Sequence, residues 1–145
     1  MEINKDRLRV YIASPLGADT PEGIMKNVNK ATDAFFRLFR LGFSPFCPHL
    51  SVFSGGCFKE ERESAHGTVI TRILSEVDYT PGETSWADWI AIDLPWVAAS
   101  DAVLRLPGPS KGADEETKHA AKCGVPVFYT EDALVLWKKT IEENQ

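Results

Sequence analysis

Hydrophobic residues along this chain follow two kinds of pattern. Four short apolar runs have the Gly, Pro or polar boundaries that are typical of buried strands: residues 8–14, 43–47, 101–106 and 125–129. Four longer stretches show helical spacing instead: residues 21–41, 86–99, 113–123 and 132–142. The first of these helices is expected to turn a set of apolar side chains toward a core: Ile24, Val28, Ala31, Phe35, Phe36, Leu38 and Phe39.

Strands that alternate with helices predict a flavodoxin-like, doubly wound α/β fold with a mostly parallel sheet. The 145 residues, 43% of them hydrophobic and 26% charged, suit a single domain over residues 1–145. Residues 50–83 fit the alternation less well, because helical spacing over 59–76 lies between Gly-rich and Pro-rich turns. We expect residues 50–83 to form an insertion or a lid over the site.

Charge and cysteine content narrow the classes of function. A formal charge of -5 argues against a broad nucleic-acid surface, although a local anion site is compatible with it. Cys47, Cys57 and Cys123 lack paired spacing, and the chain shows no signal peptide and no long apolar run. These features predict a reduced, soluble, cytoplasmic protein that binds neither nucleic acid nor membrane.

The segment LPGPSKGADEE at residues 106–116 is the clearest candidate for a site. An apolar strand ends there in a Pro/Gly loop, and a helix follows that begins near Ser110 and carries Glu116. Open parallel sheets bind ligands at this edge, and a helix N-terminus favours anions. The alternative is an ordinary joint in which Ser110 caps the helix and Glu116 faces the helix dipole.

A wider pattern resembles a known family. Six residues look like the core of the nucleoside 2-deoxyribosyltransferase-like superfamily: Asp93, Asp101, Ser110, Gly112, Glu116 and Ala120. That group includes the transferases, the N-glycosidases of nucleoside and deoxynucleoside 5'-monophosphates, and small phage-type relatives with a similar Leu-Pro-Gly, Gly-Ala, Glu spacing. The segment RVYIASPL at residues 9–16 is similar to the family's first strand and substrate loop.

The resemblance implies three catalytic roles. Glu116 would be the nucleophile at the anomeric carbon, Asp93 would give a proton to the departing base, and Tyr11 would orient the nucleophile. We expect the helix dipole to favour ionised Glu116, and burial beside Trp89 together with the charge of Glu116 to raise the pKa of Asp93. The alternatives are a solvated helical acid for Asp93 and a half-buried strand aromatic for Tyr11.

Ser110 indicates the class of substrate. By the resemblance, the transferases have an acid at this position, whereas a serine here is similar to the monophosphate N-glycosidases. A hydroxyl and free N–H groups accept a phosphate that an acid would repel. The first loop, by contrast, lacks the arginine that those hydrolases often carry. The remaining substrate contacts are expected from both loops: Ser14, Pro15, Leu16, Gly17, Gly108 and Gly112.

Base recognition has several candidates. Trp86 and Trp89 precede Asp93 and could stack on a base or belong to the core. His49 follows the second strand and could contact base or sugar. With Cys57 and His66 it could instead suggest zinc, but the spacing matches no established metal pattern, so we expect no metal and no cofactor.

These observations favour an N-glycosidase that hydrolyses a nucleoside or deoxynucleoside 5'-monophosphate. Two enzyme alternatives are a nucleoside 2-deoxyribosyltransferase and a member of the cytokinin-activating phosphoribohydrolases. The 106–116 segment half resembles the Pro-Gly-Gly, Gly-Thr, Glu signature of the second group. A third alternative, of another class, is a non-catalytic nucleotide-binding module. The resemblance also implies a homo-oligomer.

Overall fold

The computed structural model describes residues 6–49 and 85–145, and its elements follow the predicted alternation. In chain order the elements are β1 (Arg9–Ala13), α1 (Pro21–Arg40), β2 (Ser44–Phe46), α2 (Trp86–Ala99), β3 (Ala102–Arg105), α3 (Lys111–Lys122), β4 (Val127–Phe128) and α4 (Glu131–Glu143). The four described strands pair in parallel in the order β2-β1-β3-β4. The doubly wound α/β prediction is confirmed, while the predicted lid at residues 50–83 lies outside the described residues.

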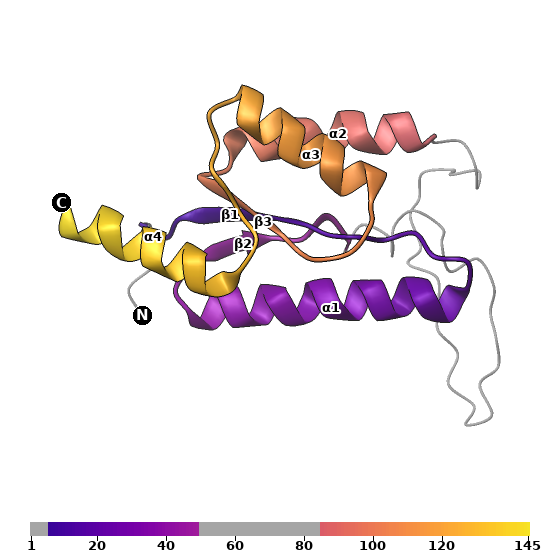
Figure 1. Cartoon of the computed structure of the whole chain (residues 1–145), viewed down its shortest axis with the longest axis horizontal. Coiled ribbons are helices and arrows are strands. Elements are labelled where there is room, and N and C mark those ends of the chain that lie inside the picture. The colour runs from indigo at the N-terminus through magenta and orange to yellow at the C-terminus, as the bar shows by residue number, and fades with distance from the viewer. Residues whose placement is uncertain (1–5, 50–84) are drawn as a thin grey trace, which may run out of the picture.

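Helices cover both faces of the sheet. Figure 1 shows α1 and α4 on one face and α2 and α3 on the other. A first apolar cluster joins the sheet to α1 and α4 through residues such as Ile12, Leu38 and Leu134. A second joins it to α2 and α3 through Val97 and Ala120. The sheet is therefore buried on both sides, as parallel sheets usually are.

The two central strands send their chains to opposite faces. After β1 the chain turns to α1, and after the neighbouring β3 it turns to α3 (Figure 1). Ala13 pairs with Arg105, so both loops leave the sheet at one level. This arrangement is a topological switch point, where open α/β sheets form a ligand-binding crevice.

Capping decides where the helices begin. The Thr20 side chain accepts from Gly23 N at 3.0 Å, and Pro21 occupies the first helical position. The Ser110 hydroxyl accepts from Ala113 N at 3.1 Å. That cap starts α3 at Lys111, earlier than the predicted residue 113, while β4 is shorter than the predicted 125–129.

The expected core face of α1 is too wide. Val28, Ala31 and Leu38 are buried, but Phe36 and Phe39 are 55% and 51% exposed. An amphipathic helix buries a limited stripe, and these two residues fall at its margins. Phe36 packs edge-on against Phe35 with ring centroids 5.4 Å apart, and the Arg7 guanidinium lies over the Phe39 ring.

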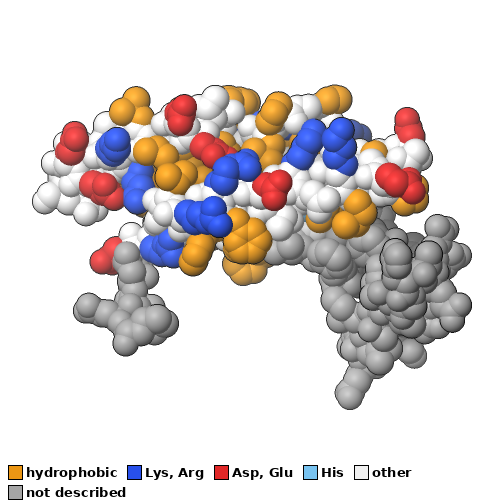
Figure 2. All heavy atoms as spheres, turned by 90° about the horizontal axis from the view of Figure 1, so that it is seen from below, with side chains coloured by type: hydrophobic (Ala, Val, Ile, Leu, Met, Phe, Trp, Pro, Cys, Tyr) orange, Lys and Arg blue, Asp and Glu red, His pale blue; other side chains and the backbone are white. Residues whose placement is uncertain are grey.

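The outer face of α1 and α4 is mixed in character. Figure 2 shows Lys and Arg side chains interspersed with Asp, Glu and scattered apolar groups on this face.

Within residues 6–49 and 85–145, no helix is long and apolar enough to span a bilayer.

The α1 and α4 packing predicts a contrast between two leucines. Leu38 is fully buried in the first cluster, so Leu38→Ala should lower the free energy of unfolding by about 2–5 kcal/mol through lost contacts and a cavity. Leu136 is 65% exposed, so Leu136→Ala should change it by less than about 0.5 kcal/mol. Urea denaturation of both variants measures the difference, and equal losses would contradict this account of the core.

Candidate functional site

A cavity of about 560 Å³ lies at the carboxyl edge of the sheet, on the side covered by α2 and α3. We refer to it as the α2–α3 cavity, and its size suits a small-molecule ligand. It brings together most of the predicted site residues: Ser14, Leu16, Gly17, His49, Trp86, Trp89, Asp93, Ser110, Gly112 and Glu116. Pro15 and Gly108 instead line a neighbouring cavity on the α1 side.

Helices α2 and α3 carry Asp93 and Glu116, which line this cavity. A capping box begins α2: the Ser85 hydroxyl accepts from Asp88 N, and the Asp88 carboxylate accepts from Ser85 N at 2.7 Å. One helical turn separates Trp89 from Asp93, so both side chains reach the same side of α2. From α3, Glu116 approaches over the sheet toward β1.

Glu116 is a buried acid with 6% of its surface exposed. Its pKa is raised to about 8, first because burial disfavours the charged form and then because Asp93 is near, while the Tyr11 hydroxyl and Arg105 act in the opposite direction. The expectation that the helix dipole favours ionised Glu116 is therefore wrong. Since α3 begins at Lys111, Glu116 lies in the second turn, beyond the reach of the dipole, and its desolvation prevails.

Asp93 has the raised pKa that the sequence led us to expect. Burial raises it to about 6, while the contribution expected from the charge of Glu116 is not found. The two acids thus titrate above their ordinary ranges inside one cavity, and the solvated-acid alternative for Asp93 does not describe this side chain.

Tyr11 lies beneath the cavity in the middle of β1 and is fully buried, not half-buried. Burial raises its pKa, and the charges of Glu116 and Asp93 add to that shift, so the phenol stays neutral and can donate a proton in a hydrogen bond. Among the described residues, neither Tyr11 Oη nor Glu116 Oε2 has a hydrogen-bond partner of standard geometry. Glu116 lines the cavity and can meet a ligand there, whereas Tyr11 is not among the lining residues and lies behind Glu116.

The N-terminus of α3 lines another part of the α2–α3 cavity. Ser110 caps the helix, as the alternative interpretation held, but its hydroxyl hydrogen can still be donated. The amides of Lys111 and Gly112 are in the first turn, where no intrahelical acceptor exists. The Lys111 ammonium lies over the Trp86 ring, 4.5 Å from its centroid, and so competes with a base for one face of that indole.

His49 supports the first loop. It is 6% exposed, and its Nε2 donates to the Pro15 carbonyl oxygen at 2.8 Å. Burial lowers its pKa, so the imidazole is neutral at physiological pH. Cys57 and His66 lie outside the described residues, and no group of three potential metal ligands occurs in the part that is described.

Sequence reasoning missed two cations. The Lys111 side chain lines the cavity. The guanidinium of Arg105, 8% exposed at the end of β3, donates to the carbonyl oxygens of Leu106 and Gly108, the latter at 2.9 Å, and to Asp114 Oδ1 at 3.1 Å. A charged residue within an apolar strand was the available signal, since buried charges require partners.

The chain was compared with protein families, curated proteins and solved structures. No protein-family model matches the chain, and no curated protein matches it. Among solved structures, the chain is similar to a 2-deoxyribosyltransferase from Bacillus psychrosaccharolyticus, described as a biocatalyst for the synthesis of antiviral and antitumoral nucleosides. The two are 20% identical, and the alignment covers 82% of this chain and 69% of that one with a TM-score of 0.48.

Proposed function

We propose that this chain is an N-glycosidase that hydrolyses the base–sugar bond of a nucleoside or deoxynucleoside 5'-monophosphate. The observation that carries the proposal is the convergence of Glu116 and Asp93, both with raised pKa values, on one cavity. Pairs of titratable groups in distinct environments are the usual machinery of glycosidic cleavage. The N-terminus of α3 at the same cavity supports an anionic substrate.

In the first step, the C1'–N bond breaks and its electron pair goes to the base, which takes a proton from the Asp93 carboxyl group. The Glu116 carboxylate forms a covalent bond to C1', which has acquired positive character. Once ionised, the Glu116 carboxylate would accept a hydrogen bond from the neutral Tyr11 hydroxyl, which would orient the nucleophile. In the second step, water loses a proton to the Asp93 carboxylate and attacks C1', which releases Glu116 and the sugar phosphate.

The proton shared by the two acids must move when substrate binds. In the empty cavity at neutral pH it favours Glu116, because that group has the higher pKa. Catalysis requires the proton on Asp93 instead. Positive character at C1' stabilises the Glu116 anion, and a base nitrogen beside Asp93 favours the protonated acid there, so the reacting substrate supports the productive arrangement.

The phosphate would bind at the start of α3. The Ser110 hydroxyl and the Lys111 and Gly112 amides provide donors, whereas the Ala113 amide is already used by the cap. The Lys111 ammonium supplies the positive charge that the first loop lacks.

Glu116→Gln should reduce release of free base on the order of a thousandfold or more while ligand still binds, because the amide keeps the shape and loses the attacking charge. The assay is chromatography of free base from a panel of ribo- and deoxyribonucleoside monophosphates, with Glu115→Gln as the matched control. Undiminished turnover would remove Glu116 from the mechanism. Exchange with an added second base would identify a transferase, and binding without base release a non-catalytic module.

The same variant should be more stable than the wild type at alkaline pH. Between pH 4.5 and about 8 the unfolded chain releases the Glu116 proton while the folded protein retains it, so wild-type stability falls as pH rises through this window. Glutamine does not titrate, and the gain should be about 4–5 kcal/mol at pH 9 and near zero at pH 4, since a difference of one pKa unit corresponds to about 1.4 kcal/mol. Urea denaturation at both pH values measures it, and a gain independent of pH would contradict the raised pKa.

Activity of the wild type should be bell-shaped in pH, with limbs near the pKa values of about 6 and about 8 of the acid pair. Below the lower limb both acids are protonated and Glu116 cannot attack. Above the upper limb both are ionised and Asp93 cannot donate.

Asp93→Asn should abolish the alkaline fall of the residual activity and move the acid limb from about 6 to higher pH, because that limb then reports Glu116 alone, whose burial keeps its pKa raised. The substrate phosphate titrates identically with both enzymes, so the difference between the two kcat/KM profiles isolates the protein groups. An alkaline fall that survives in Asp93→Asn would assign that limb to another residue.

Ser110→Asp should lower kcat/KM for monophosphates relative to free nucleosides by about tenfold or more, because it places a negative charge beside the phosphate. Aspartate is also a good helix cap, so the fold is retained. Ser110→Thr, which keeps the hydroxyl, serves as the control. If Ser110→Asp slows both substrate classes alike, the phosphate does not bind at this residue.

A further inference from the structure

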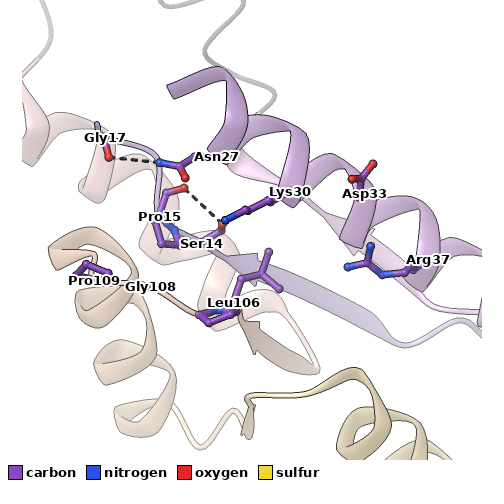
Figure 3. Close-up of a pocket in the computed structure, with 11 residues that line it drawn as sticks. Ser14, Pro15, Gly17, Asn27, Lys30, Asp33, Arg37, Leu106, Gly108 and Pro109 are labelled. Atoms are coloured by element: carbon purple, nitrogen blue, oxygen red, sulfur yellow. Dashed lines mark hydrogen bonds between the residues drawn. The ribbon is translucent and has the colours of Figure 1, made fainter. Parts of the chain in front are cut away.

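A second cavity, of about 490 Å³, lies on the α1 side of the same sheet edge. We refer to it as the α1-side cavity, and Figure 3 shows it between α1 and the two loops. Its charged and amide side chains come from one face of α1: Asn27, Lys30, Asp33 and Arg37. Its opposite wall is the Pro/Gly loop after β3.

The α1-side cavity adjoins the α2–α3 cavity. Ser14, Gly17 and Pro109 line both of them. The loops after β1 and β3 touch at the wall of the α1-side cavity, since a Cβ on Gly108, whose φ is +118°, would lie 3.0 Å from Pro15 Cγ. The two cavities are therefore the two halves of the crevice at the switch point between β1 and β3.

The side chains of the α1-side cavity are held in place. Asn27 Nδ2 donates to the carbonyl oxygens of Leu16 at 3.0 Å and Gly17 at 3.4 Å, which ties the first loop to α1. Arg37 Nε donates to Glu131 Oε1 at 2.8 Å. The two terminal nitrogens of the same guanidinium can donate to a ligand. Figure 3 shows Lys30 extending from α1 toward Ser14 and Pro15.

Lys30 is an exposed side chain and is the unpaired cation among the described residues that line the α1-side cavity. Its ammonium forms no ion pair with any residue in the described ranges 6–49 and 85–145, whereas Arg37 is paired with Glu131. The N-terminal part of α1 adjoins the first loop through Asn27. Lys30 precedes Arg37 by about two turns, or about 10 Å along the helix, so it lies nearer to the residues that both cavities share. An anion that enters from the α2–α3 cavity would meet Lys30 first.

We propose that the α1-side cavity binds phosphate groups beyond the first, so that the substrate class of this site extends to nucleoside di- and triphosphates. The inference rests on the proposed function for placing base and sugar in the α2–α3 cavity and the first phosphate at Ser110. The further phosphates pass the shared residues and reach Lys30, with the Arg37 fork beyond it. Asp33 opposes the added charge and limits its favourable effect.

Binding is tested apart from turnover by calorimetry on Glu116→Gln protein in metal-free buffer. The ligands are the four common 2'-deoxynucleoside 5'-monophosphates and the matching triphosphates. The triphosphate should bind more tightly than its monophosphate, and adding Lys30→Met should reduce that preference by about tenfold. Adding Asp33→Asn should increase the preference, because a repelling charge is removed. Lys26→Met, an exposed lysine four residues earlier on α1, is the matched control and should leave it unchanged.

Two results would overturn the inference: a triphosphate that binds no more tightly than the monophosphate, or a preference that Lys30→Met and Lys26→Met alter equally. Its failure is distinct from failure of the proposed function. If the wild type releases base from monophosphates but Lys30 has no effect, the proposed function stands without this extension. If triphosphate binding depends on Lys30 and no substrate releases base, the binding site stands without the glycosidase.

Discussion

Parallel pairing of β1 with β3 is the constraint on which the candidate site depends. The register from Val10 with Ala102 to Ala13 with Arg105 makes both chains leave the sheet together. Their helices then pack on opposite faces, which opens a crevice between the loops. The same pairing places Tyr11 at the centre of the sheet, directly below α3. A shift of one residue would turn Tyr11 to the α1 face and separate it from Glu116.

Burial of Glu116 raises its pKa, on which the proposed mechanism depends, and lowers stability at alkaline pH. A carboxyl group with 6% exposure is disfavoured as an anion, and its partial compensation by Tyr11 and Arg105 leaves the pKa near 8. A fully solvated glutamate would be ionised at neutral pH but would be a weaker nucleophile, because water would stabilise its charge. Active sites commonly retain such unfavourable groups, and the surrounding core offsets them.

The sequence was sufficient to predict the order and type of the described elements, because Pro/Gly boundaries and apolar periodicity are local signals. It also placed Ser110 and Glu116 at one sheet edge, while the family resemblance assigned Asp93 to the same site. It could not predict the ionisation of Glu116, since desolvation depends on how α3 packs against β1. For the same reason it gave Phe36 and Phe39 to the core and overlooked Arg105, whose partners become adjacent only when the loop after β3 folds back.

Arg105 stabilises the loop that leads from β3 to α3. Its guanidinium holds the carbonyl oxygens of the 106–108 segment and the Asp114 carboxylate, so it fixes the loop that leads to Ser110. Its charge also favours the anionic form of Glu116. Acids therefore gather where a sugar carbon would become positive, and cations and amides gather where phosphate would bind. This separation of charge would orient a nucleotide in the crevice before any bond is broken, because the reversed orientation would bring its phosphate against two carboxyl groups.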